Sequence, residues 1–193
     1  MDRATMESGI RTFLEGLGES FEGDDQQNTP ARVARAWCDD LVSGYAIDPA
    51  AELTWSAAPE GSGPVVVRGI SLSSICVHHL LPFFGSADVV YLPDRRLAGL
   101  SKIGRVIDAH ARRLQTQERL TLAVVDTLQK ALEPRGVIAL LRAEHTCMTL
   151  RGVRKEQSRM VTMAASGVYD RDPVARGEVL ALLAGQAGAP PSG

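Results

Sequence analysis

The sequence predicts an α+β fold in which an antiparallel sheet carries two helices on one face and further helices precede the sheet. Three observations indicate this fold: helical spacing of apolar residues near the N-terminus, short β-rich runs in two pairs, and two consecutive helical patterns between the pairs. A parallel doubly wound sheet is the weaker alternative, because the strands do not alternate singly with helices. With 193 residues, of which 45% are hydrophobic, the chain can bury one sizeable core.

The N-terminal region, residues 1–63, is predicted to be helical. Residues 4–18 place apolar side chains at helical intervals and end in glycine. A second helix is predicted to start where Thr29 can cap free amides and Pro30 takes the first helical position. Prolines and glycines break any regular pattern over residues 46–64, which marks a boundary.

The remaining chain is divided into a sheet-bearing domain, residues 64–172, and a short C-terminal segment, residues 173–193, with a mobile end. The domain has strand, strand, two helices, strand and strand, predicted over residues 65–72, 86–93, 101–132, 136–153 and 158–169.

Charge and hydropathy exclude several classes of protein. The formal net charge is −2 with both signs scattered along the chain, which does not favour nucleic-acid or membrane-surface binding. No apolar run approaches the roughly 18 residues of a membrane span, and the charged N-terminus does not resemble a signal peptide. We therefore expect a cytoplasmic protein. Three cysteines without a disulfide-framework spacing agree with a reducing compartment, where thiols are more often buried, metal-bound or catalytic.

The connection between the first two predicted strands contains candidate metal ligands. Its sequence, ICVHHLLP, places Cys76 and His79 three residues apart, and the segment AEHTCM supplies His145 and Cys147. Thiolate and imidazole suit Zn²⁺, and three ligands with an open fourth position are typical of a catalytic site. If residues 137–150 form one strand, His145 and Cys147 point to the same face.

We predict that Cys76, His79 and Cys147 bind zinc, which leaves His78 and His145 free to transfer protons beside the metal. The alternative is structural: the two cysteines are small buried hydrophobes, and the histidines bond to the backbone. The spacing alone does not decide between them, because a cysteine followed three residues later by a histidine is common by chance.

Several longer motifs resemble the catalytic domain of the GTP cyclohydrolase I family. They are CVHHLLPF, YLPDRRLAGLSKIGRVID, RRLQTQERLT, EHTCMTLRGVRK and SRMVTMAASGVY, and NTPARVARAW resembles the family's N-terminal helical segment. The resemblance, over residues 28–172, implies a zinc-dependent enzyme with the tunnelling fold. It also implies a ring-shaped homodecamer with active sites between subunits, and conversion of GTP to 7,8-dihydroneopterin triphosphate and formate.

The resemblance also implies roles for single residues at the centre of the site. The family's zinc ligands fall on Cys76, His79 and Cys147, and its catalytic histidines fall on His78 and His145. These are the residues already selected from their chemistry.

A nucleoside triphosphate carries about four negative charges, so its pocket needs directed cations and hydroxyls. The family's triphosphate-binding positions fall on Ser101, Lys102, Arg105 and Arg151. The first three stand at a predicted helix start, where free amides also favour phosphate. Ser101 is in addition a candidate proton carrier in catalysis.

The family's guanine anchor falls on Glu118, with Gln117 beside it as a further substrate-binding residue. A guanine edge presents adjacent N–H donors that one carboxylate can accept as a pair. The alternative is that Glu118 only interacts favourably with the dipole of its helix. His110 and Cys38 have no such counterpart, and we expect them to be structural.

One position beside the expected metal departs from the family. Members usually read CEHH, and this chain has Val77 where the glutamate stands. Losing a carboxylate beside a metal typically costs about ten- to a hundredfold in affinity or activity. Two alternatives therefore stay open. One is a divergent paralogue that releases a formamidopyrimidine or acts on another purine nucleotide, and the other is a non-catalytic nucleotide-binding ring.

Overall fold

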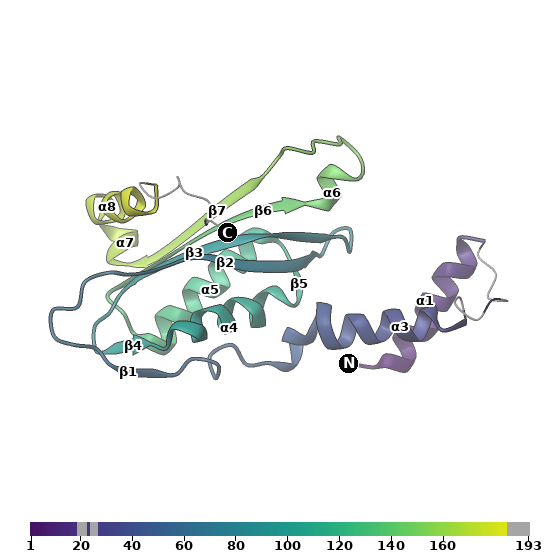
Figure 1. The fold of residues 1–193 in the computed structure, drawn as a ribbon, viewed down its shortest axis with the longest axis horizontal. Coiled ribbons are helices and arrows are strands. Elements are labelled where there is room, and N and C mark those ends of the chain that lie inside the picture. Colours follow the sequence, from purple (N-terminus) through teal and green to yellow (C-terminus); the bar gives the residue numbers. More distant parts are fainter. Residues whose placement is uncertain (19–22, 24–26, 185–193) are drawn as a thin grey trace, which may run out of the picture.

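The structure, a computed structural model, describes residues 1–18, 23 and 27–184 (Figure 1). Its main sheet has the strand order β5-β2-β3-β6-β7. The four long strands are antiparallel neighbours: β2 (Val65–Cys76), β3 (Pro82–Leu92), β6 (Gly136–His145) and β7 (Met160–Gly167). The helices α4 (Leu100–Ala111) and α5 (Gln117–Leu132) lie together on one face of this sheet. The predicted α+β fold is therefore confirmed.

The core lies between this helical pair and the sheet. Alternate residues of the central strands face the helices, and every fourth residue of α5 faces the strands, as the two periodicities require. The fully buried members include Val89, Tyr91, Val137, Ala139, Leu141, Leu120, Val124, Leu128 and Leu132. Burying each large apolar side chain contributes about 1.5 to 3 kcal/mol to folding, so the core holds the strand ends in place.

A short strand was missed between the two central helices. Leu114–Gln115 form β5, which pairs in parallel with the end of β2, with Cys76 opposite Gln115. Two residues are too few for a periodic pattern, so only the neighbouring strand makes this segment extended. This pairing brings the start of α5 to the edge of the sheet where β2 ends.

The C-terminal segment, for which no secondary structure was predicted, contains a helix. After the one-turn helix α7 (Val168–Arg171), residues Pro173–Ala184 form α8. Its side chains Val179 and Leu183 pack with Val90 of the sheet in a second, smaller core. The end predicted to be mobile, residues 185–193, lies outside the described residues.

The N-terminal helices were predicted correctly in type. The helices α1 (Arg3–Gly16) and α3 (Thr29–Ala36) pack against each other and project away from the sheet (Figure 1). Thr29 is the first helical residue and Asn28 takes the cap position, so the predicted cap was one residue late. Residues 24–26, in the polar stretch GDDQQN before Thr29, lie outside the described residues.

The chain then turns from these helices toward the sheet domain through a π-helical segment, Trp37–Leu41, and a 3-10 turn, Ser43–Ala46. Gly44 lies so close to α4 that a Cβ there would collide with the backbone oxygen of Ala109. Its N–H donates to Arg112 O at 2.9 Å, which ties the connection to the end of α4.

Residues 46–64 were predicted to be irregular, but they contain the strand β1 (Trp55–Ala57), paired antiparallel with β4 (Arg96–Ala98). Each strand has three residues, too few to give an alternating pattern. Within the described parts of the chain, no helix is long and apolar enough to cross a membrane.

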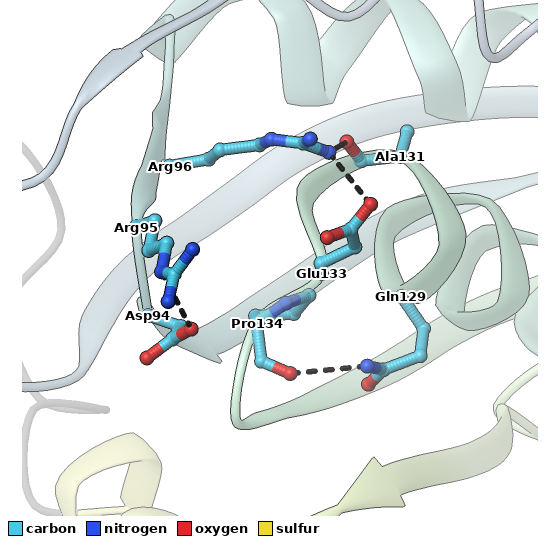
Figure 2. Close-up of polar contacts among 7 residues, drawn as sticks. All are labelled: Asp94, Arg95, Arg96, Gln129, Ala131, Glu133 and Pro134. Carbon is cyan, nitrogen blue, oxygen red and sulfur yellow. Dashed lines mark hydrogen bonds and ion pairs between the residues drawn. The ribbon is translucent and has the colours of Figure 1, made fainter.

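Arg96 anchors this small sheet to the end of α5. Its Nη1 donates to Ala131 O at 2.9 Å and to a carboxylate oxygen of Glu133 at 3.1 Å (Figure 2). Its guanidinium also lies 4.8 Å from the ring centroid of Trp55, within the range of a cation–π interaction. Free carbonyls at a helix end favour such a cation, so β4 is held beside α5.

Candidate metal centre

The candidate ligands come from two strand ends that meet at one edge of the sheet. Both β2 and β6 run antiparallel to β3, so they are parallel to each other and finish at the same edge. Cys76 is the last residue of β2, His79 lies in the connection to β3, and Cys147 follows the end of β6. One ligand atom from each of these residues lies within 4.8 Å of the other two.

The β2–β3 connection is held tightly, as a ligand-bearing turn requires. Leu80 N donates to Cys76 O at 2.9 Å, and Cys76 N donates to Leu81 O at 2.9 Å. Leu80 adopts a left-handed conformation with φ 55°, which lets the chain reverse within five residues. Val77 N donates to Gln115 O at 2.9 Å, so β5 fixes the other side of the turn.

The strand predicted over residues 136–153 is shorter in the structure, and the condition that residues 137–150 form one strand is not met. The strand β6 ends at His145, and Thr146–Thr149 form the one-turn helix α6, which carries Cys147. Thr146 Oγ1 donates to Pro82 O at 2.6 Å, and this bond ties α6 to the start of β3. Cys147 therefore reaches the other ligands because the chain turns, and not because of strand alternation.

The geometry and chemistry of the three residues fit a zinc ion. Tetrahedral zinc with bonds of about 2.0 to 2.3 Å places sulfur and nitrogen ligands about 3.6 Å apart. Cys76 Sγ lies 4.0 Å from His79 Nδ1, so a small side-chain movement is enough. Cys76 Sγ lies at the same distance from His78 Nδ1, and His79 is the histidine within reach of both sulfurs in the three-residue group.

The two sulfurs lie close enough to disfavour the thiolate form of Cys147. Burial raises the pKa of the Cys147 thiol, and the neighbouring Cys76 sulfur raises it further. A divalent ion held by these residues would favour both thiolates, because its charge would attract them.

His145 is held at the same edge by two neighbours. Its ring stacks on Phe83, with centroids 4.4 Å apart and planes 10° from parallel. Its Nε2 lies 2.9 Å from Gln117 Oε1. Burial lowers the pKa of His145, and the Glu118 carboxylate opposes this shift. The imidazole is therefore mainly neutral at pH 7, which suits a group that accepts a proton.

The first turn of α5 brings Gln117 and Glu118 to this edge. Thr116 caps the helix by accepting from Arg119 N at 3.2 Å, and β5 joins this point to Cys76. The Glu118 side chain is exposed, whereas Gln117 is only 1% exposed. Glu118 is therefore accessible to a ligand, and the Gln117 amide is enclosed by protein.

The predicted triphosphate-binding residues do not all lie together. Arg151 lies just beyond α6, near enough to Cys147 to lower the pKa of its thiol slightly. Ser101, Lys102 and Arg105 occupy the N-terminal part of α4. A helix of this length spans about 18 Å, and its other end leads into β5. These three residues therefore lie toward the opposite end of the sheet, beside β4 (Figure 1).

Local contacts confirm that placement. Gly99 N donates to Thr54 O at 3.0 Å, and Arg105 forms an ion pair of 3.5 Å with Glu52. Both partners belong to the segment leading into β1, not to the strand ends that carry the candidate ligands. A single chain does not bring Ser101, Lys102 or Arg105 to the candidate metal centre.

Sequence reasoning missed several residues around His145. Phe83 is the last residue of CVHHLLPF, so an aromatic residue close to the histidines was a usable signal. Thr121 and Thr162, which support Gln117, gave no such signal, because threonine is common in helices and strands of any function.

The residues expected to be structural have structural partners. His110 Nε2 lies 2.8 Å from Thr127 Oγ1, which joins α4 to α5. Burial, with a smaller contribution from Arg113, lowers the pKa of His110 to about 4. Cys38 is buried, and its thiol lies 3.4 Å from Met6 Sδ in the N-terminal region.

Known proteins resemble this chain over nearly its whole length. The family model described as GTP cyclohydrolase I matches residues 6–184. GTP cyclohydrolase 1 of Pelotomaculum thermopropionicum is 43% identical over 187 residues, which cover 96% of this chain and 99% of that protein. The Carboxydothermus hydrogenoformans protein of the same name is 40% identical, with 96% and 97% covered. That of Thermobifida fusca is 43% identical over 188 residues, with 96% and 90% covered.

Among solved structures, the archaeosine synthase QueF-Like in the apo form superposes with a TM-score of 0.45 at 15% identity. The match covers 56% of this chain and 97% of that chain.

Proposed function

The chain belongs to the GTP cyclohydrolase I family, and we propose that it hydrolyses GTP to 7,8-dihydroneopterin triphosphate and formate at the candidate metal centre. The observation that carries this proposal is the convergence of Cys76, His79 and Cys147 at one sheet edge. His145 and Glu118 stand at the same edge, where proton transfer and base recognition are needed.

We propose Zn²⁺ as the metal, held by Cys76, His79 and Cys147. Bound there, the ion supplies Lewis-acid chemistry and lowers the pKa of water. Three protein ligands are the number typical of catalytic zinc sites, whereas structural sites typically have four.

The side chains around the proposed ligands have different roles in the proposed reaction. His78 is exposed beside Cys76, where it can give a proton to the purine N7 as the imidazole ring opens. His145 is neutral and can accept a proton. The exposed Glu118 carboxylate can accept the paired N–H donors of the guanine edge. Arg151 lies on the same side of the molecule for a phosphate group.

We propose that a second copy of the chain completes the site. Ser101, Lys102 and Arg105 lie at the end of α4 remote from the metal ligands, so they can bind the triphosphate only in a neighbouring subunit's site. A helix start with one hydroxyl and two cations suits this role, because the free amides also attract phosphate. The arrangement supports the expected ring-shaped homodecamer with active sites between subunits.

One observation favours a second candidate function. Val77 lies between two of the proposed ligands, at a position where it offers no carboxylate to orient them or carry protons. The alternative is a paralogue that opens the purine ring and stops at a formamidopyrimidine.

An analysis of the reaction products tests both candidate functions. The purified, zinc-loaded protein is incubated with GTP, formate is measured, and dihydroneopterin is followed by fluorescence. Formate and dihydroneopterin in equal amounts support the full reaction. A formamidopyrimidine that accumulates without dihydroneopterin supports the paralogue, and the variant Val77→Glu should then gain dihydroneopterin formation. Absence of all three products contradicts both reactions and favours a non-catalytic ring.

A further inference from the structure

The Gln117 side chain is buried in a pocket of acceptors on the inner face of the sheet. Its Nε2 lies 3.1 Å from Leu141 O, 3.2 Å from Met160 O and 3.0 Å from Thr162 Oγ1. These acceptors come from β6 and β7, where Leu141 and Thr162 are paired across the two strands. The amide of Gln117 thus bridges the start of α5 to both strands.

The chemistry of this pocket determines which way the amide points. The carbonyl oxygens of Leu141 and Met160 can only accept hydrogen bonds. A reversed amide would place its own oxygen against these two oxygens in a buried site, which costs the desolvation of several unpaired groups. The nitrogen must therefore face β6 and β7, and the oxygen must face away from them.

The neighbouring threonines agree with this orientation. Thr121 Oγ1 donates its proton to Gln117 O at 2.7 Å, in the same helix. Thr121 and Thr162 hydroxyls lie 2.7 Å apart, so the proton between them must come from Thr162. Thr162 Oγ1 is then left as an acceptor toward the Gln117 amide, and every proton in the group has one consistent direction.

The fixed amide oxygen dictates the state of His145. Gln117 Oε1 lies 2.9 Å from His145 Nε2, and an amide oxygen can only accept. Nε2 must therefore carry a proton, and in the neutral ring the lone pair is on Nδ1. The parallel stacking on Phe83 at 4.4 Å resists rotation of the ring out of this arrangement.

We propose that Gln117 is a positioning residue that holds His145 as its Nε2–H tautomer, so that Nδ1 is the atom that exchanges a proton with the purine nucleotide. This inference rests on the proposed function, and it assigns Gln117 a role through His145 in place of a substrate contact. With 1% of its surface exposed and both ends of its amide bonded to protein, Gln117 cannot reach a base without breaking these bonds. The exposed neighbour Glu118 is free of that restriction.

The chain offers a matched control for this proposal. Gln129 lies on the same helix, twelve residues and about 18 Å further on. Its Nε2 donates to Pro134 O at 3.0 Å (Figure 2), and its Oε1 accepts from Ser166 of β7 at 2.7 Å. Gln129→Met thus removes a partly buried bridge from helix to strand without touching His145.

The experiment compares Gln117→Met with Gln129→Met in kinetics and in the histidine tautomer. Isotope-labelled histidine gives few signals to assign, because the chain has four histidines. Wild type should show His145 protonated on Nε2, and Gln117→Met should show a mixture of tautomers. Its kcat for formate release should fall about ten- to a hundredfold, with KM for GTP within about twofold. Gln129→Met should retain the wild-type His145 tautomer, kcat and KM.

Two results would overturn the proposal. The first is a wild-type His145 protonated on Nδ1 alone, which needs no variant to be folded. The second is a Gln117→Met protein with raised KM and unchanged kcat, because that pattern indicates a lost substrate contact. If wild type releases no formate, the proposed function fails, whereas an Nε2–H tautomer lost in Gln117→Met would still support the positioning of His145.

Discussion

The two ends of the sheet domain differ in how completely one chain builds them. At the end where β2 and β6 finish, three candidate ligands lie within 4.8 Å of one another, and His145 is held by Phe83 and Gln117. At the other end, Ser101 and Arg105 are exposed on the first turns of α4. One chain thus brings the candidate metal ligands and His145 together, whereas it leaves the side chains at the start of α4 away from them.

The largest expected effect comes from removing a candidate ligand at the end of the sheet where β2 and β6 finish, which we call the metal end. Cys147→Ser should lose most of its zinc and more than about a hundredfold of formate release, because two protein ligands do not hold a stable ion. Metal analysis and a formate assay check this. Cys38→Ser is the matched control, since Cys38 is also buried but lies near Met6. Full zinc content in Cys147→Ser would remove Cys147 from the site.

Mixing two inactive variants tests whether the two ends of the sheet domain from different chains form one site. Cys147→Ser damages the metal end, and a Lys102→Ala, Arg105→Ala double variant damages the other end. If each site takes its two ends from different chains, equal co-expression should recover about a quarter of wild-type activity, from random assembly at heterologous contacts. Each variant expressed alone should stay inactive. Co-assembled variants with no recovered formate release would place both ends in one chain's site.

Zinc binding at the metal end should also depend on pH. Burial and the Cys76 sulfur raise the pKa of Cys147, so this thiol is protonated at neutral pH and must lose its proton when zinc binds. Zinc should therefore bind at least about tenfold more tightly for each pH unit between 6.5 and 8.5, because at least the Cys147 proton is released. Competition with a chelator, corrected for the chelator's own protonation, measures this. Affinity that does not change with pH would contradict a protonated Cys147.

The smallest effect concerns His110, which joins the two helices that span the domain. Its pKa is lowered from 6.5 to about 4, so between these values the unfolded chain binds a proton that the folded chain does not. The stabilisation is complete above pH 6.5 and is lost as the pH falls toward 4. Allowing for partial exposure, the loss is about 1 to 2 kcal/mol.

Urea unfolding at pH 7 and pH 5 tests this for wild type and His110→Gln, which can keep the bond to Thr127 without titrating. The variant should lose less of its unfolding free energy between the two pH values than wild type loses. Equal losses in the two proteins would show that His110 is not the source.

Periodic segments could be predicted from the sequence, and short ones could not. The helices α1, α4 and α5 and the four long strands each show their own pattern of apolar residues over eight or more positions. The strands β1 and β5 have three and two residues, so only their partners make them extended. The one-turn helix α6 was predicted as strand, because its sequence carries no cap or period of its own.

By itself, the sequence determined which residues could bind a metal, because thiolates and imidazoles are few and their ligand chemistry does not depend on the fold. Only the tertiary structure decided which candidates meet. Cys147 joins Cys76 because β2 and β6 both run antiparallel to β3 and finish at the same end of the sheet. Ser101 stands apart because it lies at the start of α4, and only the other end of that helix leads into β5 beside Cys76. The state of His145 depends on carbonyls of β6 and β7, and a hydrogen bond between distant residues exists only once strand register has placed them.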